Sequence, residues 1–381
     1  MKTNRFYIIV AALVLLITSC DNESNMLTII NEDGTCSREM SFHPYPKSVM
    51  APLDEPIEND GLHFNSDWER TWSVLGDSTR HACPMTEAQW DSLRKVFPKQ
   101  DVSSHILMHT NRHFKSVGEM SDSLTKVVNH LFKATASLDK HFKWFYTDYV
   151  YAETYAINDM QQLFTIPLDK FVSVDTASYW FTGQPNLAED LTGSEQKELL
   201  DGIESKISKW MNANTFDYIY TYIANVFWKD IKNPPVSKEE FLVNKNSIAM
   251  SPAVENMKIF DEPEQVAKIL KDYYHTDAFE PLFSEDRHWD RILDHQYKSL
   301  QYLMWMKPQL NLVMPGSVID GGMGKVDGNV IRYRFSGERL LPHEYVISAT
   351  SRVTHVWAYV ATLLIILLAI GSFVYKRRKQ P

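Results

Sequence analysis

Three histidines at a constant spacing are the first residues in this sequence that could do chemistry. His105, His109 and His113 lie four residues apart, which would place three imidazoles on one face of a helix. Neutral imidazole is a common ligand for zinc and copper. The segment 102–115 is typical of a strand, however, in which residues four apart are about 13 Å apart. We therefore expect that at most one of them could share a metal with another element.

A second candidate site is the cluster of acidic residues and histidines from residue 286 to residue 295, on a predicted helix. Paired carboxylates with histidine could hold a divalent ion for hydrolysis, and the candidate ligands are His288, Asp290 and Asp294. Two arginines alternate with the acidic residues, however, which is the ordinary pattern of a solvated helix surface. A metal-dependent hydrolase that uses this cluster is an alternative function. Our first interpretation assigns no metal or other cofactor.

No standard catalytic motif is present. The glycine-rich segment 321–325 lacks the Ser or Thr that follows the lysine of a phosphate-binding loop, so a turn between strands is expected there. Gly-x-Ser-x-Gly, His-Glu-x-x-His and Cys-x-x-Cys do not occur. We assign no catalytic residue and expect a binding protein rather than an enzyme.

The first twenty residues predict a processed lipoprotein. A basic start, Met1–Arg5, precedes an apolar run over 6–17, which is typical of a secretory signal and short for a membrane span. Ile17-Thr18-Ser19-Cys20 resembles the bacterial lipobox, in which the cysteine is diacylated and becomes the new N-terminus. The resemblance implies that the signal peptide 1–19 is removed and that Cys20 carries membrane lipid.

The C-terminal residues predict a membrane span. The stretch 356–375 is apolar and uncharged, and about 20 helical residues cover the hydrocarbon core of a bilayer. Four cations follow it, Lys376, Arg377, Arg378 and Lys379, which places the tail 376–381 in the cytoplasm. Because both anchors must share one bilayer, we predict the cytoplasmic (inner) membrane of a bacterium, with an extracytoplasmic, periplasmic body.

Composition limits the remaining possibilities. A net charge of −9 offers no basic surface for nucleic acid, and 44% hydrophobic with 12% aromatic residues indicates a packed body. With Cys20 acylated, Cys36 and Cys83 remain as an even pair in an oxidising compartment. They are either a disulfide or two unrelated buried thiols.

Periodicity divides the body into three parts. An alternating pattern predicts a hairpin over 27–42 around Asp33-Gly34, followed by an irregular loop over 43–66. Capping boxes begin helices at Thr86 and Ser116. Strands are expected over 102–115 and 137–156, and the second, with aromatic residues on both faces, should be a central strand. Helices are then expected over 192–211, 215–231, 237–248, 262–274 and 285–306, and strands return at 310–314, 317–319, 326, 329–335 and 345–348.

This order predicts an α+β fold with a mixed or antiparallel sheet, flanking helices, a large helical insertion and one C-terminal transmembrane helix. The expected parts are a signal peptide 1–19, an N-terminal α+β region 20–166, the insertion 167–308, strands 309–350 that complete the sheet, the membrane helix 356–375 and the tail 376–381.

The returning strands carry a partial resemblance to a known family. Met314-Pro315-Gly316-Ser317-Val318 and Gly324–Val330, followed by Tyr333-Arg334-Phe335 and a single apolar helix, are similar to the end of LppM-like envelope lipoproteins. Tyr333 stands where tryptophan is usual, and the helical block lies outside the pattern. The resemblance implies a membrane-tethered β module, and members of the family are associated with lipid or glycolipid handling.

Three functions remain open. The first is a membrane-anchored binding module whose ligand is a lipid, a glycan or an envelope protein, with an aromatic cleft formed from the rows at 142–155 or 216–228. The second is the metal-dependent hydrolase, which requires the 286–295 cluster to face a pocket. The third is a structural subunit of a membrane complex.

Overall fold

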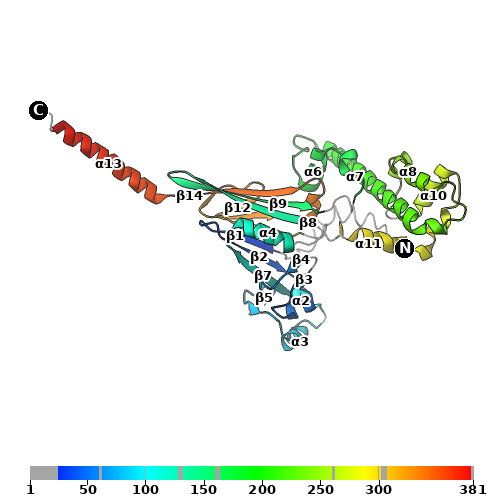
Figure 1. Ribbon diagram of the computed structural model, residues 1–381, viewed down its shortest axis with the longest axis horizontal. Coiled ribbons are helices and arrows are strands. Elements are labelled where there is room, and N and C mark those ends of the chain that lie inside the picture. Colours follow the sequence, from blue (N-terminus) through cyan, green and yellow to red (C-terminus); the bar gives the residue numbers. More distant parts are fainter. Residues whose placement is uncertain are drawn as a thin grey trace. The chain divides into compact units, whose positions relative to one another are not determined.

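The computed structural model describes residues 25–378 except 60–61, 99, 128–131, 159–163, 260–261, 299 and 302–306. The fold is α+β, with a long helical segment inserted between strands (Figure 1). The described residues form two compact units. A β unit comprises 25–156, 307–336 and 344–378, and a helical unit comprises 157–306 and 337–343.

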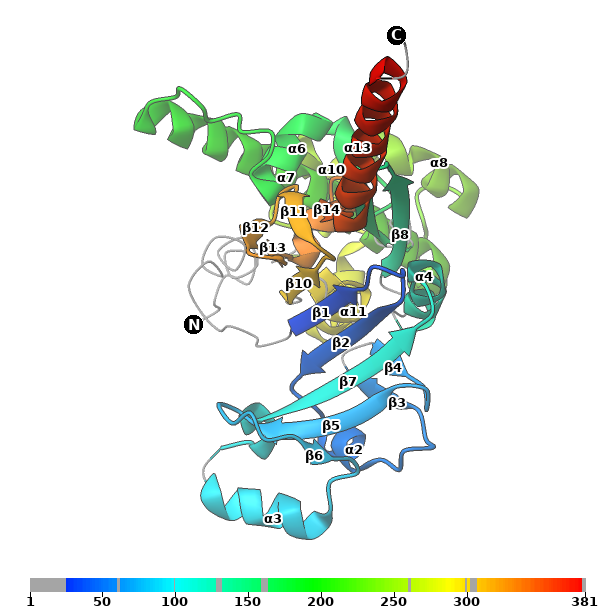
Figure 2. The same cartoon turned by 90° about the vertical axis from the view of Figure 1, so that its left-hand side faces the viewer.

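The main sheet of the β unit has eight strands. The N-terminal hairpin, β1 (Asn25–Ile30) and β2 (Cys36–Phe42), lies in its middle and confirms the hairpin expected from the alternating pattern. β10 (Gln309–Val313) pairs with β1 in parallel, so the chain returns to the same sheet after the helical insertion. The order is β12-β13-β10-β1-β2-β7-β5-β6, and the other strands are β5 (Glu69–Val74), β6 (His81–Ala82), β7 (Ile106–Phe114), β12 (Lys325–Asp327) and β13 (Val330–Arg334). Figure 2 shows β1, β2, β7 and β5 side by side.

A second sheet of four strands has the order β11-β14-β9-β8. The single strand predicted over 137–156 is wrong, because this segment folds as a hairpin of β8 (Phe132–Phe142) and β9 (Tyr146–Ile157). The aromatic residues of this segment belong to two strands, so they do not occupy the two faces of a single strand as expected. β9 is nevertheless a central strand, between β8 and β14 (Tyr345–Thr354); β11 (Ser317–Asp320) is the far edge.

Short elements fill the segment expected to be an irregular loop. A helix, α2 (Pro46–Met50), and a small hairpin of β3 (Ile57–Asn59) and β4 (Leu62–Phe64) form there, so that prediction is wrong in part. The capping box at Thr86 does begin a helix, α3 (Glu87–Val96). The helix expected after Ser116 is α4 (Val117–Val127), which packs mainly against β8.

The core of the β unit contains side chains from both sheets. β9 buries alternate residues, among them Tyr149, Tyr151 and Tyr155. From the main sheet, Met40 and Tyr333 are equally buried. The two sheets are joined directly, since the Tyr333 hydroxyl donates to the Ser348 carbonyl of β14 over 2.9 Å.

The Met-Pro-Gly turn after β10 needs its glycine. Gly316 has φ +70°, and a Cβ at this position would lie 2.2 Å from the carbonyl oxygen of Arg352 in β14. Only glycine accepts both the left-handed conformation and the close approach of another strand. The turn therefore brings the chain from the main sheet to the second sheet.

The helical unit is built on α7 (Gly193–Tyr222), one helix of 30 residues where two were expected. The predicted break falls at Asn212 and Asn214, which are poor helix formers. Both amide side chains find tertiary partners instead: Asn214 donates to the Ile166 carbonyl over 3.0 Å, and Asn212 donates to the Met257 carbonyl. A π-helical turn, Ile223–Phe227, and a short 3₁₀ turn, Trp228–Asp230, follow. The other helices are α6 (Val174–Thr182), α8 (Lys238–Ala249), α9 (Pro252–Glu255), α10 (Gln265–Tyr274) and α11 (Trp289–Gln296).

The last helix, α13 (Val356–Arg378), follows β14 with only His355 between them. Among the described residues it is the one helix long and apolar enough to cross a membrane, with a mean hydropathy of 2.3 and 6% of its most apolar window buried. This is the apolar C-terminal helix that the sequence predicts. It could serve as a membrane anchor.

Candidate functional site

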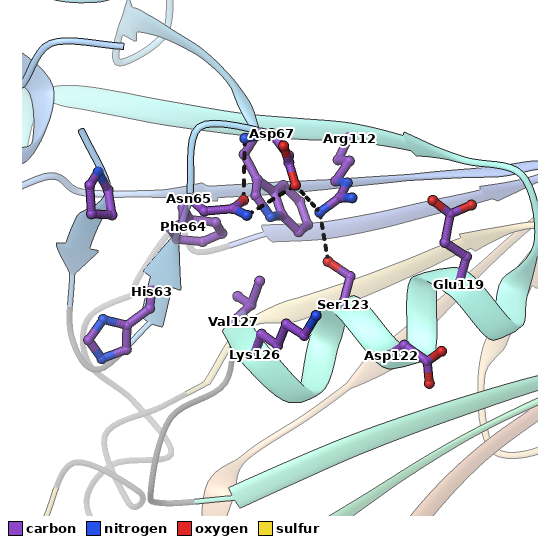
Figure 3. Close-up of a pocket in the computed structure, with 12 residues that line it drawn as sticks. His63, Phe64, Asn65, Asp67, Arg112, Glu119, Asp122, Ser123, Lys126 and Val127 are labelled. Carbon is purple, nitrogen blue, oxygen red and sulfur yellow. Dashed lines mark hydrogen bonds and ion pairs between the residues drawn. The ribbon is translucent and has the colours of Figure 1, made fainter. Parts of the chain in front are cut away.

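A pocket of about 370 Å³ lies in the β unit between α4, β7 and the segment around β4 (Figure 3). Its floor is aromatic, formed by Phe64 and Trp68, whose rings meet edge to face with centroids 5.3 Å apart. The volume falls within the range of small-ligand sites. The remaining lining residues are mostly polar: Pro56, His63, Asn65, Asp67, Arg112, Glu119, Asp122, Ser123, Lys126 and Val127.

Arg112 organises the polar wall of the pocket. Its guanidinium lies 3.2 Å from an Asp67 carboxylate oxygen and donates to the Ser123 hydroxyl, also over 3.2 Å (Figure 3). The Asn65 side-chain amide donates to the same Asp67 oxygen, Oδ2, over 3.0 Å. Side chains from a loop, a strand and a helix are thus held in one network that presents fixed donors and acceptors.

The pocket is lined by groups of both charge signs. Three lining residues are acidic (Asp67, Glu119 and Asp122), two are cations (Arg112 and Lys126), and His63 adds an imidazole. Such a wall offers many hydrogen bonds without a strong net field. The arrangement suits a polar, uncharged ligand better than an acyl chain or a highly charged group.

A buried ion pair connects the two sheets of the β unit. Arg38 of β2 and Glu153 of β9 have side chains only 1% and 2% exposed, and one guanidinium nitrogen lies 2.7 and 2.8 Å from the two carboxylate oxygens. The hydroxyls of Tyr151 and Tyr155 each donate to the same carboxylate over 2.7 Å. Burial by itself lowers the pKa of Arg38, but the adjacent Glu153 carboxylate outweighs it and raises the pKa, so the guanidinium stays charged.

A second polar cluster lies on the opposite face of the same sheet. His109 of β7 is 2.8 Å from the Ser41 hydroxyl through Nδ1 and 2.9 Å from the Ser73 hydroxyl through Nε2. Glu39 lies 3.7 Å from Nδ1 and accepts two 2.7 Å hydrogen bonds from Arg80. Burial raises the pKa of Glu39, but the hydrogen bonds from His109 and Arg80 outweigh it and lower the pKa to about 2.

The serine and histidine of this cluster have the types of a nucleophile and its base. Ser41, Ser73 and His109 are each less than a tenth exposed, however, so a substrate cannot reach either hydroxyl. The cluster instead joins three neighbouring strands, β2, β7 and β5, through side-chain hydrogen bonds.

The strand predicted over 102–115 is confirmed for two of the three regularly spaced histidines and is wrong for His105. His109 and His113 are in β7, and His105 ends the preceding 3₁₀ turn, Val102–His105. His113 is exposed, whereas His109 is buried in the serine cluster. The structure therefore does not bring the three imidazoles together.

The 286–295 cluster lies on the surface of the helical unit. His288, Asp290 and Asp294 are all exposed. The first part of the helix predicted over 285–306 is instead a 3₁₀ turn, Glu285–Arg287, followed by the short α11. Residues 298, 300 and 301 are helical again, and 299 and 302–306 lie outside the described residues. His288 stands between them in a left-handed conformation, with φ 52°. Among the described residues, no three His, Cys, Asp or Glu side chains are grouped so as to hold a metal ion.

Cys36 and Cys83 are both buried as free thiols, so the disulfide is not formed in this structure. Cys36 of β2 pairs with Phe114 at the end of β7, whereas the Cys83 amide donates to the carbonyl of Arg70 in β5, which lies opposite Thr110 in the middle of β7. The two cysteines are therefore about three strands apart across the sheet and about four residues apart along the strand direction. This distance is far beyond the reach of a disulfide. Burial raises the pKa of each thiol to about 11, which keeps both protonated and unreactive at neutral pH.

The structure describes only some of the candidate residues at the two ends of the chain, and it describes the glycine-rich segment. Cys20 and the whole signal segment lie outside the described residues, as does Lys379. The other tail cations, Lys376, Arg377 and Arg378, form the last turn of α13. The glycine-rich segment is a tight turn between β11 and β12, closed by a 2.9 Å hydrogen bond from the Gly324 amide to the Gly321 carbonyl.

Sequence reasoning missed the pocket because its residues come from three separate segments. The one readable signal was on α4, where Glu119, Ser123 and Lys126 recur at spacings of four and three and so share a helix face. Nothing local indicated that this face would meet Asp67 and Arg112.

A comparison with protein-family models, with curated proteins and with solved structures found no match to this chain. The functional argument therefore depends on the residues of the chain itself.

Proposed function

We propose that this protein is a membrane-anchored envelope lipoprotein whose body binds a neutral glycan in the α4–β7 pocket. The anchor is inferred from α13, which is apolar, almost unburied and followed by cations. The lipobox at Cys20, the cationic tail and the partial LppM-like resemblance support an inner-membrane lipoprotein with a periplasmic body.

The binding function is carried by one observation, the polar wall that Arg112 organises above an aromatic floor. Glycans present hydroxyl groups that pair with carboxylate, amide and guanidinium groups such as Asp67, Asn65 and Arg112. An acyl chain has no group that could pair with this wall. Glycan is therefore favoured over lipid as the ligand class.

The two anchors can be tested by fractionating membranes from cells that make the full chain. Cys20→Ser and the pair Leu364→Arg/Leu367→Arg should each leave the protein in the membrane, because one anchor remains. Arginine at the centre of a span costs about 2.5–3.5 kcal/mol, so the three substitutions combined should release it. Release by Cys20→Ser alone would contradict a spanning α13. Release by the arginine pair alone would contradict lipidation.

The orientation has its own test. A reporter enzyme that is active only outside the cytoplasm, fused after Pro381, should be inactive. Activity would contradict the cytoplasmic placement of the tail.

The pocket can be tested by saturation-transfer NMR on the full chain in detergent, with neutral mono- and disaccharides as probes. Arg112→Met should lower the affinity for any sugar that binds by about tenfold, since a charge-assisted hydrogen bond contributes about 1.5–3 kcal/mol. The matched control is Arg332→Met in β13 of the main sheet, whose side chain is 48% exposed, and it should leave binding unchanged. Equal effects of the two substitutions, or binding of a fatty-acid probe alone, would contradict the assignment.

A further inference from the structure

The turn between β8 and β9 places exposed aromatic residues at the end of the second sheet from which α13 leaves. The turn is closed by a 2.7 Å hydrogen bond from the Lys143 amide to the Tyr146 carbonyl. Tyr146 is paired with Thr354, the last residue of β14, so the hairpin reaches at least as far as the strand that leads into α13. We call the residues His141–Phe145 the hairpin tip.

The hairpin tip continues along the first turns of α13. The Trp144 indole nitrogen donates to the Thr362 hydroxyl over 2.9 Å. The Trp144 ring also meets Trp357 edge to face at 5.3 Å, and the Phe145 ring lies 4.7 Å from that of Tyr359. Thr362 is six residues beyond the helix start, which corresponds to about 9 Å along the helix axis.

This depth takes the hairpin tip through the polar layer of a bilayer. The headgroup region adds about 5–7 Å to each side of the hydrocarbon core, so a segment that follows a membrane-spanning α13 for about 9 Å passes this region and reaches the hydrocarbon core. Phe142 and Trp144 remain 62% and 46% exposed despite their contacts. Large aromatic side chains exposed beside a spanning helix are typical of the membrane interface, where the apolar ring and the polar N–H are both satisfied.

The charge around the hairpin tip suits phosphate-bearing headgroups. His141 and Lys143 are exposed on the tip, and His355 stacks beside Phe142 at 5.2 Å. Arg352, with its guanidinium 3.6 Å from the Tyr146 ring centroid, is paired with Asp148 over 2.6 Å, so these two charges cancel. Lys143 then remains as the exposed cation of the hairpin tip, beside the imidazoles of His141 and His355, which can form hydrogen bonds with phosphate oxygens.

We propose that the hairpin tip inserts into the interface of the bilayer that α13 spans and binds phospholipid headgroups there. The inference depends on the proposed anchor and adds a second, independent point of contact. Together the two contacts fix the angle between the second sheet and the membrane plane.

Photocrosslinking of the full chain in vesicles of phosphatidylethanolamine and phosphatidylglycerol tests the proposal. Benzoylphenylalanine is placed at Phe142, at Leu367 in the middle of α13, or at Val346, which is 40% exposed at the opposite end of β14. Lipid adducts are expected from Phe142 and Leu367 and not from Val346. Adducts from Leu367 alone would overturn the inserted tip while the anchor stands. Adducts from neither Phe142 nor Leu367 would overturn the anchor itself.

A charge reversal tests the headgroup contact separately. Lys143→Glu should lower the yield of Phe142 adducts in these anionic vesicles about fivefold, because each basic group near such a surface contributes about 1 kcal/mol. Lys47→Glu, on α2 of the same unit, is the control and should not change the yield. An unchanged yield with Lys143→Glu would overturn the electrostatic part of the proposal.

Discussion

Arg38 and Glu39 are neighbours in β2, yet their side chains enter opposite faces of the main sheet and different environments. Arg38 lies in a dry core with a single carboxylate and two tyrosine hydroxyls. Glu39 lies at the edge of a cluster where Arg80 is 47% exposed to solvent. The comparison shows how burial changes the role of an ion pair. In the core, loss of one partner leaves an uncompensated charge and destabilises the protein strongly. Near solvent, the pair contributes modestly to stability.

The largest effect is expected from breaking the core pair. Arg38→Met leaves the Glu153 carboxylate buried without its cation and should destabilise the β unit by about 3–5 kcal/mol. Urea unfolding of the full chain in detergent measures the loss. Arg332→Met, which removes an exposed pair with Asp327, should cost less than about 1 kcal/mol. A similar small loss for both would contradict the role assigned to burial.

The double variant Arg38→Met/Glu153→Gln sharpens the same point. It removes both charges, and the glutamine oxygen can still accept from one tyrosine, so part of the stability should return. If the loss of unfolding free energy in the double variant equals the sum of the losses in Arg38→Met and Glu153→Gln, the two residues do not act as a pair.

On the opposite face of the main sheet, substitution of the buried His109 should cause the largest loss of stability. His109→Ala leaves the Ser41 and Ser73 hydroxyls buried without their shared partner, at an expected cost of about 1–3 kcal/mol in the same unfolding experiment. His113→Ala, on the exposed side of β7, is the matched control and should be nearly neutral. Equal losses would show that the serine cluster does not stabilise the sheet.

The Glu39 carboxylate makes a pH-dependent contribution. Its pKa is lowered in the folded protein from the ordinary 4.5 to about 2, so its contribution is complete above about pH 4.5 and is lost as the pH falls towards 2. Glu39→Gln should therefore cost stability at pH 6, by about 1–2 kcal/mol, and much less at pH 2.5. The control is Glu69→Gln, whose exposed side chain is the first of β5. A stability difference between Glu39→Gln and the unmodified protein that grows as the pH falls would contradict the ion pair of Glu39.

The smallest change should follow loss of Arg80. Because this side chain is half exposed, Arg80→Ala should reduce stability by at most about 1 kcal/mol, and added salt should weaken the effect further. Thermal unfolding at low and high ionic strength measures it. A loss as large as that of Arg38→Met would remove the distinction between the two faces.

Local sequence rules predicted the elements whose cause is local. The Asp33-Gly34 turn, the capping box at Thr86 and the apolar run of α13 all act within a few residues, and each formed as expected. The alternation of β2 even places Arg38 on the same side as Met40 and Phe42. Its partner Glu153 is 115 residues away, however, and no local pattern can identify it.

The wrong predictions fall where one sequence pattern is compatible with two structures. Alternating aromatics over 137–156 suit one long strand as well as two shorter ones, because the turn at Lys143 lacks glycine and proline. The pocket was missed for a related reason: Arg112, Asp67 and Ser123 meet only after the sheet, the small hairpin and α4 have packed.

The edges of the two sheets have a further consequence if α13 anchors the protein in a membrane as proposed. Molecules held in one plane meet each other often, and open strand edges are templates for pairing between copies. In the main sheet the edge strands β12 and β6 have only three and two residues. In the second sheet β11 carries an irregular register, and α4 lies against β8, where the Ser121 hydroxyl accepts from the Ala136 amide. Each edge is short, irregular or covered, so crowding of many copies at the membrane need not join their sheets into larger assemblies.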